Sequence, residues 1–464
     1  MLSKFFGDRA FYKKILFVAV PIMIQNGMTN FVNFLDNIMV GGIGTEQISS
    51  VAIVNQLIFV FNLCIFGAIS GAGIFSAQFF GKKDIDGVRS TFRYKIWIAF
   101  IITSITIIIF TLFGGDIINK YLQGSADGGD MAVTLMCGKQ YLSIMLFGLP
   151  AFMVTQIYAS TLREAGETIV PMGAGVSAVV VDLVFNWLLI YGKFGFPELG
   201  VRGAAIATMM SRYIEAGIVV FWTHYKRRRF TYINGMYRTL KVPAVLLKDI
   251  LKKGLPLLLN ESLWAGGMAI LAQCYSVRGL AVVAGMNISN TIGNLFNIVF
   301  FAMGDCISII VGQLLGAGKM EKAKDTDRKM ITFAVLCSMV VAVVLFTFAP
   351  MFPENYNVNS QSKELAASFM RIAACFIPMV SFLHSSYFTL RSGGKTIITF
   401  LFDSVFMWVV SVPVAYSLSH YTGMRIEYIY ICVNAVDIIK CIIGFVLVKK
   451  GVWLNNIVES CPKN

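Results

Sequence analysis

Twelve long apolar runs constrain this chain more than any other feature of its sequence. Each run contains about 20 residues or more, which is the length that a helix needs to cross a bilayer. None alternates apolar with polar residues, as the strands of a membrane barrel do. The runs occupy residues 15–40, 48–78, 94–113, 132–160, 168–191, 203–224, 250–274, 281–311, 329–349, 365–390, 396–418 and 427–448. We therefore predict an all-α polytopic membrane protein with twelve transmembrane helices.

The composition excludes a soluble protein. Apolar residues make up 57% of the 464 residues and charged residues 14%, against roughly 45–50% and about 25% in soluble globular domains. The lipid bilayer is therefore the environment that we expect around most of the chain. We expect a monomer within that bilayer.

The positive charges are distributed unevenly between the apolar runs. With the N-terminus placed inside the cell, 29 of the 39 Lys and Arg residues fall in segments of the inner face, and six fall in outer loops. Such an excess on one side is typical of cytoplasmic loops. We therefore predict a plasma-membrane protein with both termini in the cytoplasm. Membrane topology accounts for the net charge of +14, and we expect no nucleic-acid partner.

The second half of the chain repeats the first. Anchors recur in the same order, at an offset that decreases from 235 to 228 to 221 residues, as loop deletions between equivalent helices would produce. They are Pro21 with Pro256, Gln78–Gly81 with Gln313–Gly316, Thr161–Arg163 with Thr389–Arg391, and Asp182–Trp187 with Asp403–Trp408. We predict two lobes of six helices, at residues 1–224 and 250–464, joined by a basic cytoplasmic connection at 225–249. A transported solute would bind between such lobes.

Asp36 is the most informative charged residue inside an apolar run. A charged side chain in a membrane segment costs about 2.5–3.5 kcal/mol on insertion scales, and Asp36 has no cation within one helical turn. It lies beside a polar stripe on the same predicted helix, formed by Asn26, Asn30, Asn33 and Asn37. We interpret Asp36 as a functional residue.

Other polar residues also interrupt the apolar runs. Asp182 and Asn186 share one face of the fifth run, because they are four residues apart. Two further pairs, Asp437 with Lys440 and Arg212 with Glu215, are explained by local ion pairing at i, i+3 spacing. The remaining candidates are Glu261, Asp305, His384 and Asp403. The alternative interpretation of each is a structural group that is hydrogen-bonded inside the protein or reaches the lipid headgroups.

A buried carboxyl group of this kind binds one of two ions. Burial disfavours its charged form, so it takes up a proton readily. The same carboxylate, flanked by amide and hydroxyl oxygens, also suits Na⁺, since hard cations prefer oxygen ligands. The sequence leaves both ions open.

Several short stretches, in order and in both halves, resemble the multidrug and toxic compound extrusion (MATE) family. They are Val20–Pro21 leading to Asp36–Gly41, Ala77–Gly81, Thr161–Gly166, Gly203–Thr208, Gly312–Gly316 and Thr389–Lys395. The resemblance implies two six-helix lobes around a central cavity. It also implies export of amphipathic, often cationic compounds by alternating access, in exchange for inward H⁺ or Na⁺, with no cofactor.

The resemblance further implies an ion site in the first lobe, carried here to Asp36, Asp182, Asn186 and Thr208. The match is imperfect in the fifth run. Many relatives have Asn first and Asp four residues later, whereas in this chain Asp182 precedes Asn186. In the second lobe, some members have an acid about one helical turn after the position of Glu261. This chain has Trp264 at that position. Some members also have an acid in the tenth segment, which this chain lacks. His384 is the only titratable group near that position, so a proton relay and a structural polar role both remain open for it.

Other functions fit the sequence less well. A lipid-linked saccharide flippase is the nearest alternative, but it should have a cationic cavity for pyrophosphate, whereas the deep charges here are mainly acidic. Gly394-Lys395-Thr396 is similar to part of a phosphate loop, yet Thr389 stands where that loop needs Gly. No zinc-binding or nucleophile spacing indicates an enzyme. A sensory or purely binding membrane protein is a third possibility, although we identify no attached soluble domain in the sequence.

Overall fold

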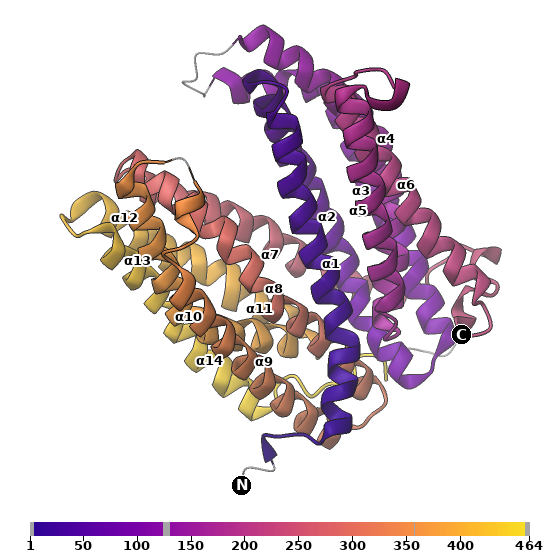
Figure 1. Ribbon diagram of the computed structural model, residues 1–464. Helices are drawn as coiled ribbons and strands as arrows, with labels where there is room; N and C mark the ends of the chain where they lie inside the picture. Colours follow the sequence, from indigo (N-terminus) through magenta and orange to yellow (C-terminus); the bar gives the residue numbers. More distant parts are fainter. Residues whose placement is uncertain (1–3, 124–129, 357, 460–464) are drawn as a thin grey trace. The chain divides into compact units, whose positions relative to one another are not determined.

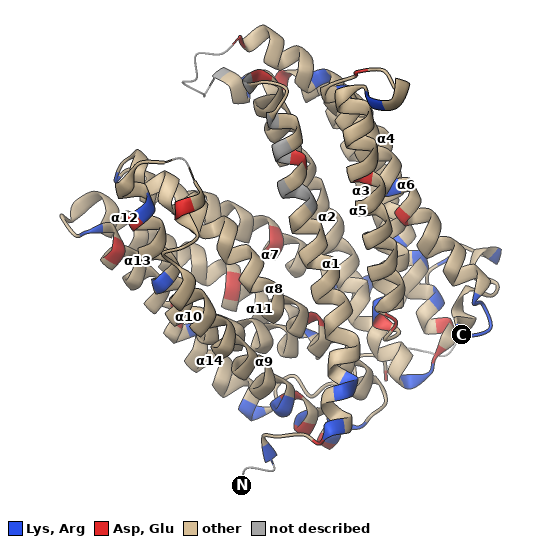
Figure 2. Cartoon of the chain, in the orientation of Figure 1, with Lys and Arg blue, Asp and Glu red and all other residues tan. Residues whose placement is uncertain are grey.

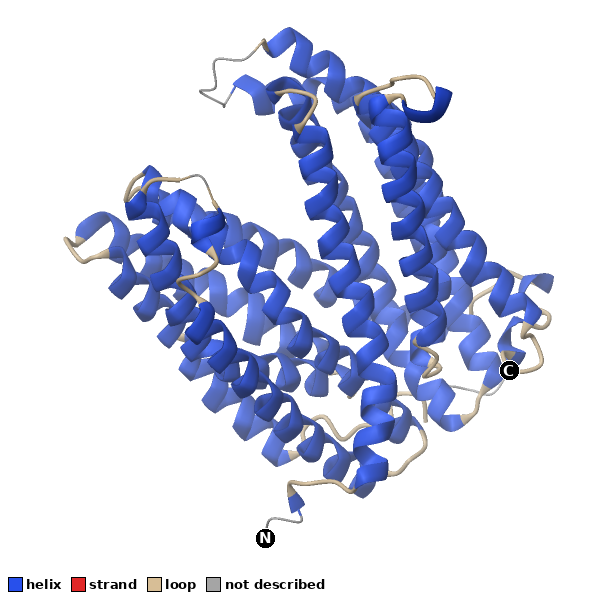
Figure 3. Ribbon diagram, viewed as in Figure 1, coloured by secondary structure: helices blue, strands red, loops and turns tan. Residues whose placement is uncertain are grey.

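The computed structural model describes residues 4–123, 130–356 and 358–459. Within these residues every regular element is a helix and there is no strand (Figure 3). Eleven helices of the described part are long and apolar enough to cross a membrane, and α1, with 33 residues, adds a further long helix. The all-α architecture with twelve spanning segments is therefore confirmed.

The helices contain almost all residues of the predicted runs, and several extend beyond them (Figure 1). In the first half they are α1 (Arg9–Gly41), α2 (Thr45–Lys82), α3 (Ile85–Gln123), α4 (Met131–Glu164), α5 (Ile169–Tyr191) and α6 (Val201–Tyr225). In the second half they are α7 (Ala244–Ser276), α8 (Leu280–Gly316), α9 (Met320–Phe348), α10 (Ser360–Ser392), α11 (Thr396–Phe400), α12 (Val412–Tyr421), α13 (Ile426–Ala435) and α14 (Asp437–Lys450).

Two helices begin well before the apolar runs that predicted them. The first turns of α3 and α9 are polar, so a hydropathy pattern does not include them. Local ion pairs stabilise these turns: Arg89 pairs with Asp86 in α3 at 2.7 Å, and Lys329 pairs with Asp325 in α9 at 2.6 Å. The helices therefore extend beyond the length that crosses the hydrocarbon core.

The last two predicted segments are interrupted. Between α11 and α12 the chain forms two π-helical stretches, η6 (Leu401–Val405) and η7 (Met407–Ser411). Pro413 follows them at the start of α12, and its missing N–H leaves a carbonyl of the preceding turn without its usual partner. Wide turns of this kind are frequent at functional sites. The apolar pattern continues through both stretches and did not predict them.

The chain divides into two compact units. Within the described residues, unit 1 contains 4–23, 77–83, 251–356 and 358–459, and unit 2 contains 24–76, 84–123 and 130–250. The predicted division into residues 1–224, 225–249 and 250–464 stays a prediction. Two short segments of the first half are grouped with the second half in unit 1.

Each unit has its own apolar core. In unit 2, α6 packs against α4 and α5, and the largest core cluster includes Val54, Leu142 and Ile190. In unit 1, α10 packs against α8 and α9, and the largest cluster includes Met303 and Trp453. These helix pairs position the polar groups described below.

The repeated Gln-x-x-Gly motif explains why residues 77–83 belong to unit 1. Gly81 lies directly against the backbone of Gln313, and Gly316 lies directly against the backbone of Gln78. The Gln78 side chain also binds three backbone groups: it donates to the carbonyl oxygens of Ser392 and Asn455, and it accepts from the amide of Ile457. Glycine is needed in both motifs because the two backbones meet where a Cβ atom would lie.

We expect Gly316→Ala to destabilise unit 1. A Cβ atom at this position would collide with the carbonyl oxygen of Gln78, and overpacking of this kind costs about 1–3 kcal/mol. Thermal unfolding of the detergent-purified protein measures the loss. Gly293→Ala is the matched control, because it lies on the same helix with nothing within 4 Å of the added atom. Equal melting temperatures of the two variants would contradict the close approach.

The basic connection after α6 is folded onto unit 2. Three side chains on one face of α3, at i, i+4 and i+8, donate to three of its backbone carbonyl groups. These hydrogen bonds join Arg89 to Tyr232 (3.1 Å), Arg93 to Met236 (3.2 Å) and Trp97 to Leu240 (3.0 Å). Burial raises the pKa of the Tyr232 hydroxyl, so it stays neutral at physiological pH. Figure 2 shows Lys and Arg mostly at helix ends and in connections of this kind.

Candidate ion-binding site

Asp36, Asp182 and Asn186 meet inside unit 2. The Asn186 side-chain amide donates to Asp36 Oδ1 at 2.7 Å and to Asp182 Oδ2 at 3.2 Å. Asp182 and Asn186 are buried, with 3% and 1% of their surface exposed, and Asp36 is half-buried. Two carboxyl groups from α1 and α5 therefore share one amide group in a site of low dielectric.

Two oxygen atoms of this cluster have no hydrogen-bond partner among the described residues. They are Asp182 Oδ1 and Asn186 Oδ1, and both are buried. The hydroxyl groups of Thr208 and Ser211 on α6 lie close to the Asp182 carboxyl group and interact with it as hydrogen-bonding groups, but Asp182 Oδ1 accepts no hydrogen bond of normal geometry among the described residues. A buried oxygen without a donor is costly, and either a proton or a small cation would remove that cost. We call Asp36, Asp182, Asn186 and Thr208 the unit 2 cluster.

No ion pair neutralises the two carboxyl groups among the residues that the structure describes. Arg212 on α6 acts on them from a distance, and its guanidinium group lies over the Phe152 ring, 4.9 Å from the centroid. The predicted pairing of Arg212 with Glu215 is absent from the described ion pairs, whereas Lys440 pairs with Asp437 at 3.0 Å as predicted. Asn33 and Asn37 of the predicted polar stripe lie outside the described side chains.

A second polar cluster lies inside unit 1, next to the π-helical stretch. The Asn260 side-chain amide donates to Asp403 Oδ2 at 3.0 Å and lies 3.3 Å from the Tyr387 hydroxyl group. The Ser404 hydroxyl group lies 2.7 Å from Asn260 Oδ1 and 2.8 Å from its backbone oxygen. Asp403 is the repeat mate of Asp182, so a carboxyl group bound by an amide occurs at equivalent positions of the two halves.

The other candidates of the second half occupy different surroundings. Glu261 on α7 is half-buried, and Asp403, Asp305 and Arg391 act on it electrostatically. His384 lies among aromatic rings, with centroids at 4.9 Å for both Phe301 and Phe388. No described hydrogen bond or ion pair joins His384 to an acid. The structure thus places Asp305 and Asp403 near Glu261, and it surrounds His384 with apolar rings.

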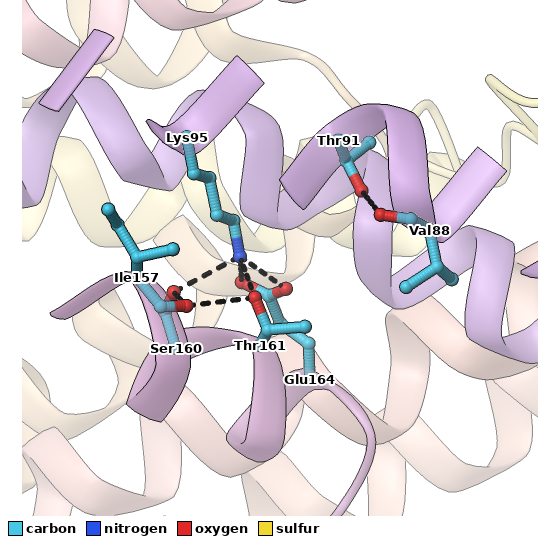
Figure 4. A network of polar contacts seen from close by, with 7 residues as sticks. All are labelled: Val88, Thr91, Lys95, Ile157, Ser160, Thr161 and Glu164. Atoms are coloured by element: carbon cyan, nitrogen blue, oxygen red, sulfur yellow. Dashed lines mark hydrogen bonds and ion pairs between the residues drawn. The ribbon is translucent and has the colours of Figure 1, made fainter. Parts of the chain in front are cut away.

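Sequence reasoning missed a buried ion pair between Lys95 on α3 and Glu164 at the C-terminal end of α4. The Lys95 ammonium group contacts both carboxylate oxygens of Glu164 at 2.8 and 2.7 Å, and it also donates to Thr161 Oγ1 at 3.0 Å and Ser160 Oγ at 3.1 Å (Figure 4). The Lys95 side chain is completely buried. A Lys within an apolar run, together with the repeated Thr-Leu-Arg motif, was the available signal.

Comparison with known proteins decides the family. A family model described as MatE matches residues 21–188 and 256–417. The chain belongs to the MatE family. It is therefore a multi-pass membrane transporter of the MATE multidrug efflux family, and not an enzyme. Among the described residues, no group of three or more His, Cys, Asp or Glu side chains forms a metal site.

This MATE chain is similar to curated proteins over almost its whole length. It is 25% identical over 445 residues to the probable multidrug resistance protein NorM of Thermotoga maritima, which covers 95% of this chain and 93% of the relative. It is 21% identical over 408 residues to the probable multidrug resistance protein YoeA of Bacillus subtilis, with 88% and 87% covered.

Solved structures share the fold. A mutant of the Vibrio cholerae MATE transporter VcmN superposes with a TM-score of 0.86 at 16% identity, covering 96% of this chain and 98% of that one. A MOP superfamily transporter from Pyrococcus furiosus gives a TM-score of 0.83 at 22% identity, with 98% of both chains covered. These likenesses support the two-lobe arrangement of twelve helices.

Proposed function

We propose that this MATE transporter exports amphipathic, often cationic small molecules from the cytoplasm in exchange for H⁺ or Na⁺. The exchange operates by alternating access in the plasma membrane, with both termini in the cytoplasm and one chain as the functional unit. The unit 2 cluster binds the coupling ion. The curated relatives, whose names describe multidrug resistance proteins, support the substrate class.

The paired carboxyl groups are the observation that carries the proposal. Asp36 and Asp182 contact the same amide group of Asn186, and no described ion pair neutralises them. Two carboxylates so close in a site of low dielectric cannot both remain charged unless a cation joins them. One monovalent ion is therefore bound or released when the charge of the cluster changes.

The oxygens of the cluster suit both candidate ions. A proton on either carboxyl group would provide the missing donor for a neighbouring oxygen. Na⁺ would bind Asp182 Oδ1 and Asn186 Oδ1, which have no hydrogen-bond partner, together with Asp36 and the Thr208 hydroxyl group. Both arrangements use oxygen ligands, which hard cations prefer.

In this proposal, the acids of unit 1 contribute to substrate binding. Asp403 and Asp305 act on Glu261 electrostatically, as does Arg391, and acids gathered in this way attract cationic substrates. We assign Glu261 to the contact with substrate charge, because it is the half-buried acid on which the other two act. His384 has no part in this proposal, since aromatic rings surround it.

Exchange balances the electrical work of export. Moving a monovalent cation outward against an inside-negative potential costs about 2.3 kcal/mol per 100 mV. Entry of one H⁺ or Na⁺ cancels this work, and a tenfold ion gradient then supplies about 1.4 kcal/mol, which is enough for about tenfold accumulation of substrate. Coupling requires that ion binding and substrate binding favour different conformations.

Proteoliposomes with imposed gradients test the function. With the purified protein in the membrane and ethidium outside, we expect a tenfold outward H⁺ or Na⁺ gradient to drive ethidium uptake of up to about tenfold. The two gradients are applied separately, so the experiment also identifies the coupling ion. A protonophore or a Na⁺ ionophore should abolish the corresponding uptake. Uptake that needs neither gradient would refute the exchange.

A further inference from the structure

Asp327 on α9 is a buried acid that the proposed exchange does not use. Only 1% of its surface is exposed. Its Oδ1 atom lies 2.6 Å from Thr389 Oγ1 on α10. Thr389 Oγ1 also lies 3.0 Å from the backbone oxygen of Ser385. The hydroxyl group of Thr389 thus contacts two oxygen acceptors at once.

The equivalent network in unit 2 shows how such a hydroxyl group is satisfied. Thr161 and Ile157 are the repeat mates of Thr389 and Ser385 at an offset of 228 residues. Thr161 Oγ1 lies 2.9 Å from the Ile157 backbone oxygen, and the Lys95 ammonium group donates to it at 3.0 Å (Figure 4). The threonine donates its single proton to the backbone and accepts one from the lysine.

Among the described residues of unit 1, no lysine contacts Thr389 as Lys95 contacts Thr161, and Asp327 contacts the threonine instead. A hydroxyl group has one proton, so Thr389 cannot donate fully to both Ser385 and Asp327. Both short contacts are satisfied if Asp327 carries a proton. Asp327 then donates to Thr389, and Thr389 donates to Ser385, as in the network of unit 2.

We propose that Asp327 is a proton-binding site of unit 1, at which the protonated carboxyl group donates a hydrogen bond to Thr389 Oγ1. The ligand is H⁺, held by a neutral carboxylic acid in place of the ammonium group of Lys95. This inference does not depend on the role of Asp36, because it rests on contacts inside unit 1. Loss of the proton would leave a buried carboxylate and an oxygen of Ser385 competing for one hydroxyl proton.

Among the described residues, no ion pair neutralises the Asp327 carboxyl group. Helices α8 and α10 pack against α9, and the start of α1 contacts it through the rings of Tyr12 and Phe333. The interactions that influence the protonation of Asp327 are its burial and the hydrogen bond with Thr389. The charged or titratable groups on these elements, Asp327 apart, are Arg9, Tyr12, Lys13, Lys14 and Asp36 on α1, Asp305 and Cys306 on α8, Glu321, Lys322, Lys324, Asp325, Arg328, Lys329 and Cys337 on α9, and Lys363, Glu364, Arg371, Cys375, His384, Tyr387 and Arg391 on α10.

Protonation at this site gives stability a defined dependence on pH. The unfolded chain releases an aspartic acid proton near pH 4, whereas the folded chain keeps it at higher pH. The unfolded state therefore binds fewer protons than the folded state in this range, so stability falls as the pH rises. Above the pH at which the folded protein also releases the proton, the dependence ends.

Infrared spectroscopy of the purified full-length protein tests the site directly. At neutral pH, the difference spectrum between wild type and Asp327→Asn should contain the C=O stretching band of one protonated carboxyl group. Asp325→Asn is the matched control, since Asp325 is two residues away and pairs with Arg328 and Lys329 at 2.8 and 2.6 Å. Its difference spectrum should contain only the bands of an ionised carboxylate. The same ionised bands for Asp327→Asn would overturn the proposal.

A second variant covers the case in which Asp327→Asn does not fold. Thr389→Val removes the acceptor, so the carboxylic acid band should remain and move to higher frequency. No change in that band would contradict the hydrogen bond and overturn the proposal. The melting temperature of Asp327→Asn should also fall less steeply with rising pH than that of wild type, by an amount that corresponds to one proton. Parallel slopes would mean that the folded protein does not hold this proton.

Discussion

Asp36→Asn should reduce ion-driven substrate uptake into proteoliposomes to the level of protein-free vesicles. Asparagine has nearly the same shape as aspartate and keeps an oxygen that can accept from Asn186, so the contact at 2.7 Å can persist. It cannot release a proton, and it lacks the charge that would hold Na⁺ beside Asp182. The cluster would then keep one charge state throughout the cycle, and ion binding could no longer favour one conformation over another.

The control for Asp36→Asn is Asp116→Asn. Asp116 is an exposed acid of α3 in the same unit, and its replacement should leave uptake unchanged. Size-exclusion profiles and melting temperatures of both variants establish that they fold. Gradient-driven uptake by Asp36→Asn at the wild-type rate would remove Asp36 from the coupling mechanism. Because the H⁺ and Na⁺ gradients are tested separately, a loss with only one of them would identify that ion.

The helices were predictable because a membrane imposes strict demands on sequence. A segment in hydrocarbon must satisfy every backbone group internally, and it must be apolar over about 20 residues. Because of these demands, runs such as 132–160 and 365–390 can be recognised from the sequence without any information on tertiary structure. The π-helical stretches from Leu401 to Ser411 were invisible, since they change the turn geometry while the apolar pattern continues.

The unit 2 cluster was predictable in part, and for a specific reason. Asp36 was conspicuous as an isolated charge in an apolar run, and Asp182 with Asn186 as a pair on one helix face. That they meet across α1 and α5 depends on packing, which spacing within a helix does not determine. Asn260 was a weaker signal, because placing an amide group inside a membrane costs less free energy than placing a charge there. Its contact with Asp403 joins residues that are far apart in the sequence.

Lys95→Met should strongly destabilise the protein, because it breaks the buried ion pair of unit 2. Methionine fills a similar volume but leaves the Glu164 carboxylate without the ammonium group that contacts both of its oxygens. Removing one partner of a buried pair typically costs about 3–5 kcal/mol. We expect a large fall in the melting temperature of the detergent-purified protein, or a loss of folded protein during expression.

The exposed pair between Lys363 and Glu354 provides the control. Their side chains are 26% and 71% exposed, and surface pairs contribute about 0–1 kcal/mol, so Lys363→Met should change the melting temperature little. The double variant Lys95→Met with Glu164→Gln should recover part of the lost stability, because it also removes the buried carboxylate charge from which the ammonium group has been taken away. If Lys95→Met were no more harmful than Lys363→Met, the buried pair would not stabilise the junction of α3 and α4. Recovery in the double variant would instead show that the cost comes from isolating a buried carboxylate, the same cost that Asp327 avoids by holding a proton.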